Sequence, residues 1–209
     1  MSRNAAARTL MAVLACVALA QARAAAVTVR LANPDAVPIA EAVVMFDPVD
    51  AKPPAGTQAT AIVDQINKRF VPHLAVVQAG TAISFPNSDH IRHQVYSFSP
   101  AKTFMLKLYA GSPRMNVTFD KPGLVVLGCN IHDSMVGLIA VTDTPYFAKS
   151  DADGAVTVDL PPGAYRMRIW HAELAAPIVP KPVQVGANAL TIPVQAALDH
   201  SAAAPAPWP

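Results

Sequence analysis

Apolar and polar residues alternate with a period of two over most of the chain, a pattern typical of half-buried β-strands. Val27, Val29 and Leu31 show it first, and the run 39–46 is apolar and rich in β-branched residues. Short strands at regular spacing predict an all-β sandwich or barrel. Further apolar runs, separated by Gly, Pro and Asn turns, lie at 74–77, 83–85, 95–98, 104–108, 117–119, 124–127 and 136–141.

The segment 61–70 fits two patterns. Ile62, Ile66 and Phe70 would share one face of a helix, because they recur at a spacing of four. Pro72 and the strands on either side favour an extended chain instead. We therefore expect either a strand or a single helical turn in this segment.

The pattern changes after residue 142 and divides the chain. We expect a main β domain at 27–142 and a small β appendage at 143–194 that packs against it, because roughly fifty residues rarely form an independent core. The Ala- and Pro-rich tail 195–209 predicts disorder. Within the appendage, 151–154 reads Asp-Ala-Asp-Gly. It lacks the distal Glu of a calcium loop, so we expect a hairpin turn.

The first residues resemble a signal peptide. Arg3 and Arg8 form a basic start, 10–20 is a short apolar run, and Ala22-Arg23-Ala24 is a small-x-small cleavage site. The prediction is a leader at 1–24 and a periplasmic protein without stable membrane insertion, because the run is too short to span a bilayer. Cys16 leaves a lipid anchor open as an alternative.

The charge balance argues against nucleic acid as a partner. The expected leader carries three of the 16 basic residues, which leaves 13 against 14 acidic ones and a net charge of about −1. Clustered Lys and Arg along one face are missing from this sequence, so nucleic-acid binding is not expected.

The most informative stretch is the Gly-bounded segment 128–137. It holds Cys129, His132 and Met135 in the spacing Cys-x-x-His-x-x-Met. Thiolate and thioether are soft ligands and imidazole is borderline, so two His, one Cys and a weak axial Met form the set expected for an electron-transfer copper. After removal of the leader Cys129 is the only thiol of an exported chain, which by itself calls for an explanation. One His remains to be found.

Three His of the main domain are candidates for the missing ligand: His73, His90 and His93. We prefer His93, because it begins an alternating strand directly after a loop, and His90 remains the alternative. His73 and His171 lie next to apolar residues, where a structural His is common.

These motifs carry a resemblance. The segments Arg92–Pro100 and Gly128–Met135 resemble those of the cupredoxins, the blue copper proteins. The short loop is similar to the amicyanin type, and both segments are closest to exported bacterial methylamine-utilisation-like proteins. That group usually has two adjacent His where this chain has His93-Gln94. The likeness is specific over 74–141 and looser over 143–173.

The resemblance implies a Greek-key β-sandwich that holds one type 1 copper. The implied ligands are His93, Cys129, His132 and Met135, with Met as the long axial ligand. By analogy His132 presents an imidazole edge to redox partner proteins. Asn87 and Asn130 are candidates for orienting the ligand loop.

We therefore expect a monomeric carrier of single electrons between periplasmic redox partners. The alternatives are a copper-binding, delivery or interaction module without redox function, and a structural β protein without metal. We do not expect an enzyme. The sequence shows no Ser/His/acid trio, no Gly-rich phosphate loop and no paired carboxylates.

Overall fold

A computed structural model describes residues 24–50, 59–113 and 115–209. All regular elements of these residues are β-strands, and none of them forms a helix able to cross a membrane. The expected leader lies outside the described residues. In chain order the strands are β1 (Ala25–Ala32), β2 (Val43–Pro48), β3 (Thr60–Ile62), β4 (Asp64–Ile66), β5 (Arg69–Val71), β6 (Leu74–Gln78), β7 (Thr81–Ser84), β8 (His93–Ser99), β9 (Lys102–Tyr109), β10 (Val117–Phe119), β11 (Gly123–Gly128), β12 (Val136–Thr142), β13 (Phe147–Lys149), β14 (Ala155–Leu160), β15 (Gly163–Trp170), β16 (Lys181–Val185) and β17 (Leu190–Gln195).

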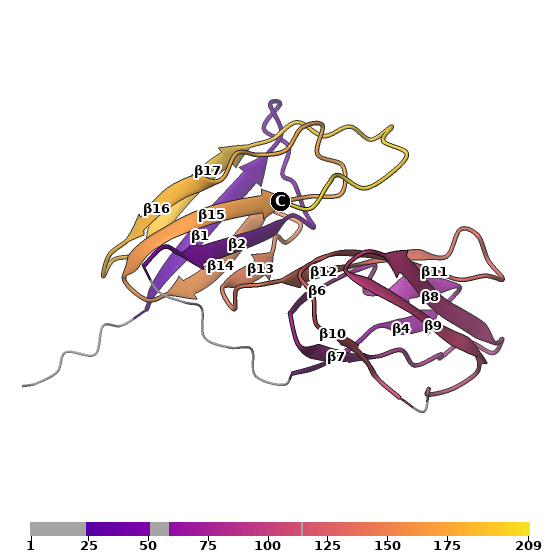
Figure 1. Cartoon of the computed structure of the whole chain (residues 1–209). Helices are drawn as coiled ribbons and strands as arrows, with labels where there is room; N and C mark the ends of the chain where they lie inside the picture. The colour runs from indigo at the N-terminus through magenta and orange to yellow at the C-terminus, as the bar shows by residue number, and fades with distance from the viewer. Residues whose placement is uncertain (1–23, 51–58, 114) are drawn as a thin grey trace, which may run out of the picture.

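The strands form two units that lie side by side (Figure 1). In the first, a five-stranded sheet of order β6-β12-β11-β8-β9 packs against a three-stranded sheet of order β10-β7-β3. The alternating apolar side chains of both sheets meet in one core, which includes Phe85, Val95, Phe119, Val125 and Leu127. The predicted all-β sandwich is confirmed. The ambiguous segment is extended, since β3, β4 and β5 occupy it.

The second unit is larger than the expected appendage. Its two sheets have the orders β14-β1-β17 and β13-β2-β15-β16, so β1 and β2 belong to it and not to the main domain that we expected at 27–142. β1 pairs with β14 antiparallel and with β17 in parallel. The prediction was wrong for β1 and β2 because their partners are distant in the sequence, and the local pattern of apolar residues does not reveal such long-range pairing.

The continuous apolar run of β2 is explained by its position between two cores. Val44 and Phe46 point into the core of the second unit, whereas Val43 and Met45 point to its other side. All four are fully buried. A strand that is covered on both faces reads as a continuous apolar run instead of an alternating one.

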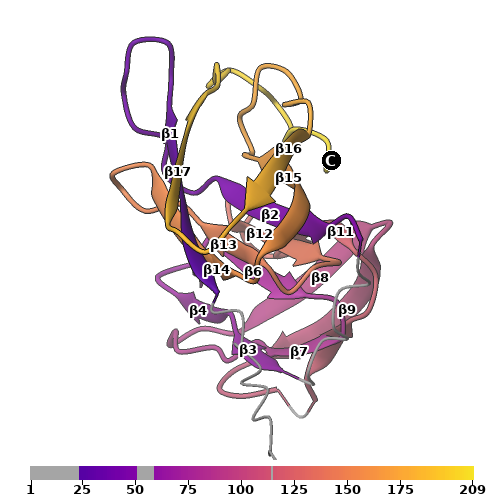
Figure 2. The same ribbon diagram turned by 90° about the vertical axis from the view of Figure 1, so that its left-hand side faces the viewer.

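The side of β2 that carries Val43 and Met45 faces the first unit. Leu74 of β6 and Leu138 and Ala140 of β12 pack there, together with Trp170 of β15. Figure 2 shows β6 and β12 next to β13 and β2 at this boundary. A shared apolar layer therefore joins the two units and covers the outer face of β6 and β12.

The tail at 195–209 differs from the disorder that its composition predicted. Gln195 still belongs to β17. Trp208 packs on Trp170 with ring centroids 5.5 Å apart, and Trp170 Nε1 donates a hydrogen bond of 3.0 Å to the carbonyl oxygen of Ala206. One aromatic residue at the end of an Ala/Pro segment anchors it, because a large ring buries much apolar area.

We predict that Trp208→Ala destabilises the protein by about 1–3 kcal/mol, the range for loss of a partly buried aromatic contact. Urea unfolding measures the change. Val179→Ala is the matched control, because Val179 is 79% exposed. Equal midpoints for Trp208→Ala and the unaltered protein would show that the tail adds no stability.

Candidate metal centre

Three of the four residues predicted as metal ligands lie together at one end of the first unit. One ligand atom each of His93, Cys129 and His132 lies within 4.8 Å of the others. Cys129 Sγ is 3.8 Å from His93 Nδ1, and the imidazole centroids are 5.1 Å apart. His93 and Cys129 are buried, and His132 is half-buried. A buried thiol between two imidazoles is a set of donors suited to copper or zinc.

Strand pairing brings these residues together. β8 lies beside β11, and Tyr96 of β8 is opposite Gly128 of β11. His93 begins β8 on the side that faces the core, and Cys129 directly follows β11 on the same side. The pairing of β8 with β9 shifts register between His93 and Val95, an irregularity of the kind that re-aims side chains near functional sites.

The ligand loop is short because β11 and β12 form a hairpin. Gly128 is opposite Val136, and the N–H of Met135 donates to the carbonyl oxygen of His132 at 2.9 Å. Both flanking glycines allow a close approach. A Cβ at Gly137 would lie 2.8 Å from Cβ of the buried Phe70, so a larger residue is excluded there. A Cβ at Gly128 would lie 2.7 Å from the end of the Tyr96 ring and would have to displace it.

An acidic residue orients His93. Asp89 Oδ2 lies 2.7 Å from His93 Nε2, and the backbone N–H groups of Asn67 and Lys68 donate to the same carboxylate at 2.6 and 2.8 Å. Burial opposes ionisation of Asp89, but these three donors outweigh it and keep its pKa below the ordinary value. An ionised carboxylate only accepts, so Nε2 of His93 carries the proton and Nδ1 turns its lone pair toward Cys129.

His132 provides the test of whether a metal fits. Its Nδ1 is buried and has no hydrogen-bond partner among the residues that the structure describes. Burying such an atom without a partner costs about 1–3 kcal/mol. A metal ion bound between the two imidazoles and the thiolate satisfies this nitrogen, so the donor set fits a copper ion.

Met135 is fully buried, in the same apolar cluster as Cys129. The hydrogen bond between Met135 and His132 fixes its place in the loop. Its role as an axial ligand belongs to the proposal below. His90, the alternative to His93, is exposed and lies outside the cluster.

Asn87 shapes the loop before His93. Its Nδ2 donates to the carbonyl oxygens of Ile91 and Tyr109, both at 2.9 Å, and its Oδ1 accepts from the N–H of Asp89 at 3.1 Å. Asn130, the other predicted orienting residue, is exposed. Burial raises the pKa of Tyr109 to about 12, so this phenol adds no charge beside the site at neutral pH.

Sequence reasoning missed Asp89. The available signal was an acid four residues before a candidate ligand, but this spacing has no geometric meaning in an irregular loop.

The remaining residues that the sequence analysis considered lie outside this site. His171 Nδ1 accepts from the N–H of Glu173 at 3.1 Å. Asp151 Oδ1 accepts from the N–H groups of Asp153 and Ala155, so the segment is a turn. It is not the hairpin that we expected, because the flanking strands β13 and β14 belong to different sheets.

The comparisons with known proteins found similar solved structures only. No protein-family model matches the chain, and no curated protein matches it. A copper-containing nitrite reductase from Thermus scotoductus SA-01 is 26% identical with a TM-score of 0.38 over 46% of this chain. The match spans about a quarter of the reductase, 25%.

Two smaller proteins match over nearly their whole length. A purple cupredoxin from Nitrosopumilus maritimus is 22% identical over 41% of this chain and 100% of its own, with a TM-score of 0.35. An oxidized amicyanin variant is 16% identical over 46% of this chain and 98% of its own, with a TM-score of 0.37. The structural neighbours are thus cupredoxins, and the argument about function rests on the site itself.

We predict that Asp89→Asn lowers the affinity for Cu(II) about 10- to 100-fold, the usual cost of losing a carboxylate behind a ligating His. The amide replaces one of the two accepting oxygens by Nδ2, a donor, so either the Asn67 N–H or both the Lys68 N–H and His93 Nε2 lose their acceptor. Competition with a chelator measures the affinity. Asp133→Asn in the ligand loop is the matched control, because Asp133 is exposed. Equal affinities for the two variants would contradict the orienting role.

The lowered pKa of Asp89 also predicts a pH dependence. Its ionised form stabilises the fold at pH values above the ordinary carboxyl pKa of 3.8. This contribution is lost as the pH falls through the lowered pKa. In urea unfolding of the apo-protein at pH 6, the free energy of unfolding should therefore be higher for the unaltered protein than for Asp89→Asn, and the difference should become smaller in acid. A difference that is constant with pH would contradict the stabilising role of ionised Asp89.

Proposed function

We propose that this protein is an exported, monomeric cupredoxin that holds one type 1 copper and carries single electrons between periplasmic redox partner proteins. The observation that carries the proposal is the cluster of His93, Cys129 and His132, in which the buried Nδ1 of His132 has no hydrogen-bond partner among the described residues. The periplasmic location is supported by the signal-peptide pattern of the first residues.

Each of the four residues would provide one ligand atom to the metal. His93 offers Nδ1, because Asp89 holds its other nitrogen. Cys129 offers Sγ, and His132 offers Nδ1. Met135 is the proposed weak axial ligand. Copper bound there supplies one-electron chemistry by alternating between Cu(II) and Cu(I).

A rigid ligand site favours rapid transfer of electrons. Cu(II) prefers tetragonal surroundings and Cu(I) prefers trigonal or tetrahedral ones. The ligands come from a strand start and a tight hairpin, and the Asp89 hydrogen bonds and the close contacts of the flanking glycines fix both. The site therefore changes little when the oxidation state changes. His132 is the half-buried ligand and the natural edge for contact with a partner.

An enzymatic role is not part of the proposal. The four proposed ligands fill the coordination that a type 1 copper needs and leave no position for a substrate. A second candidate function, copper storage or delivery, shares the same ligands. Cyclic voltammetry separates the two, because a carrier cycles reversibly whereas a storage protein holds Cu(I) tightly and responds poorly.

We predict that the apo-protein with Cu(II) develops an intense visible band from thiolate-to-copper charge transfer, and that Cys129→Ala abolishes it. The thiolate is the source of the transition, so no other residue substitutes for it. Ser134→Ala, in the same loop, is the control and should keep the band. The proposal fails if the unaltered protein shows no band or if Cys129→Ala retains it.

A further inference from the structure

The hairpin of β4 and β5 belongs to neither large sheet of the first unit. Its strands form a two-stranded sheet of their own, and the turn between them has a left-handed backbone at Asn67 and Lys68. A two-stranded hairpin alone is only marginally stable in water. Its place in the fold therefore depends on its contacts, and these contacts are with the two segments that carry the proposed ligands.

β4 is attached to the loop that precedes β8. The backbone N–H of Gln65 donates to the carbonyl oxygen of Pro86, and the carbonyl oxygen of Gln65 accepts from the N–H of Ser88, both at 3.0 Å. The Ser88 hydroxyl donates to Asp64 Oδ2 at 2.8 Å. The turn of the hairpin also donates to Asp89. The hairpin is thus hydrogen-bonded along most of this loop.

The Gln65 side chain extends the attachment into the core. It is fully buried, and its Nε2 donates to the carbonyl oxygen of Pro86 at 3.0 Å and to the Tyr109 hydroxyl at 2.6 Å. The Tyr109 hydroxyl donates in turn to the carbonyl oxygen of Phe85. Tyr109 is directly opposite His93 in the pairing of β9 with β8. Gln65 therefore joins the loop before His93 to the strand beside it.

The amide of Gln65 is unfavourable for a residue that only fills space. Its Oε1 is buried and has no hydrogen-bond partner among the residues that the structure describes. Burial of an acceptor without a partner costs free energy, whereas an apolar side chain of similar length would fill the same space without this cost. The two hydrogen bonds that the amide donates are the physical reason for Gln at this position.

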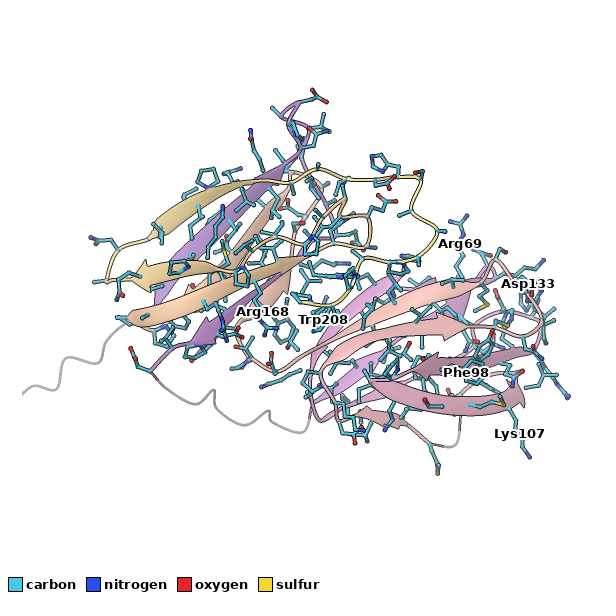
Figure 3. The ribbon with its side chains drawn as sticks, turned by 45° about the horizontal axis from the view of Figure 1, so that its top comes forward. Arg69, Phe98, Lys107, Asp133, Arg168 and Trp208 are labelled. Atoms are coloured by element: carbon cyan, nitrogen blue, oxygen red, sulfur yellow. The ribbon has the colours of Figure 1, made fainter. Side chains whose placement is uncertain are left out.

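β5 is attached to the hairpin that carries the other proposed ligands. Phe70 is buried in the same apolar cluster as Met135. A Cβ at Gly137 would lie 2.8 Å from Phe70 Cβ, so Phe70 lies directly on the backbone of β12, two residues after Met135. Figure 3 shows Arg69 of β5 toward the same end of the first unit as Asp133 of the ligand loop.

We infer that the hairpin of β4 and β5 is a clamp on the metal centre, in which Gln65 and Phe70 are positioning residues that keep the two ligand-bearing segments at a fixed separation. This inference rests on the proposed function. Within the sheet the two segments meet through the pairing of β8 with β11. The clamp joins them a second time, outside the sheet. It opposes movement of the ligands toward the tetragonal arrangement that Cu(II) prefers.

Two substitutions loosen the clamp at its two attachments. Gln65→Met removes the donors of the amide and keeps the length of the side chain. Phe70→Leu weakens the contact with β12. Phe119→Leu is the matched control, because Phe119 is also buried in the same core but lies on β10, an edge strand of the other sheet.

The first test uses the full chain loaded with Cu(II). We expect Gln65→Met and Phe70→Leu each to lower the affinity for Cu(II) about tenfold, as is usual for residues that orient metal ligands. Both should also change the relative intensities of the visible bands and the copper hyperfine splitting in electron paramagnetic resonance, because the site relaxes toward tetragonal geometry. Phe119→Leu should keep the spectra of the unaltered protein. Unchanged spectra for the two clamp variants, or equal changes with Phe119→Leu, would overturn the inference.

Hydrogen exchange in the apo-protein tests the coupling without a metal. The N–H groups of Ser88 and Met135 are both hydrogen-bonded, one in each ligand-bearing segment. Because a clamp moves as one body, Phe70→Leu should speed exchange at Ser88 as well as at Met135, and Gln65→Met should do the same. Phe119→Leu should leave the ratio of these two rates to those of other core amides unchanged.

Acceleration confined to the segment that each substituted residue touches would overturn the inference, because the hairpin would then make two separate contacts. The proposed function fails in a different way, if the unaltered protein forms no visible band with Cu(II).

Discussion

The pairing of β8 with β11 is the constraint on which the proposed site depends. It is a long-range contact that places the first residue of one strand beside the residue that follows the other, so His93 and Cys129 meet. The hairpin of β11 and β12 then adds His132 from the same loop. Asp89 completes the arrangement, because it fixes which nitrogen of His93 faces the thiol. Loss of the strand pairing would separate the donors even with every ligand present in the sequence.

The second unit packs against the first through a single apolar layer. β2 is buried on both sides, with Phe46 in the core of its own unit and Met45 against the other. The tail strengthens this boundary through Trp208 and Trp170. The layer covers the outer face of β6 and β12, whereas Phe98 of β8 and Met105 of β9 stay exposed on the same sheet. The arrangement of the two units therefore decides which surface near the site a partner could reach.

Local patterns in the sequence correctly predicted the features that depend on residues close together in the chain, namely the strands and the ligand loop. Alternation predicted the strands, and the spacing of Cys129 and His132 predicted that both would point into one site, which the hairpin explains. The division of the chain at residue 142 was wrong for β1 and β2, because their partners are β14, β17, β13 and β15. Asp89 was missed for a related reason. Its importance follows from a left-handed turn at Asn67 and Lys68 that aims two N–H groups at it. Nothing in the local sequence links that turn to a residue about twenty positions later.

The central claim is that a thiolate and two imidazoles bind one copper ion together. X-ray absorption at the copper edge tests it most directly, because it identifies the atoms nearest to the metal. The account predicts one short contact to sulfur and two contacts to imidazole nitrogen at a single copper per chain. Only nitrogen and oxygen neighbours, or a variable number of copper ions per chain, would contradict it.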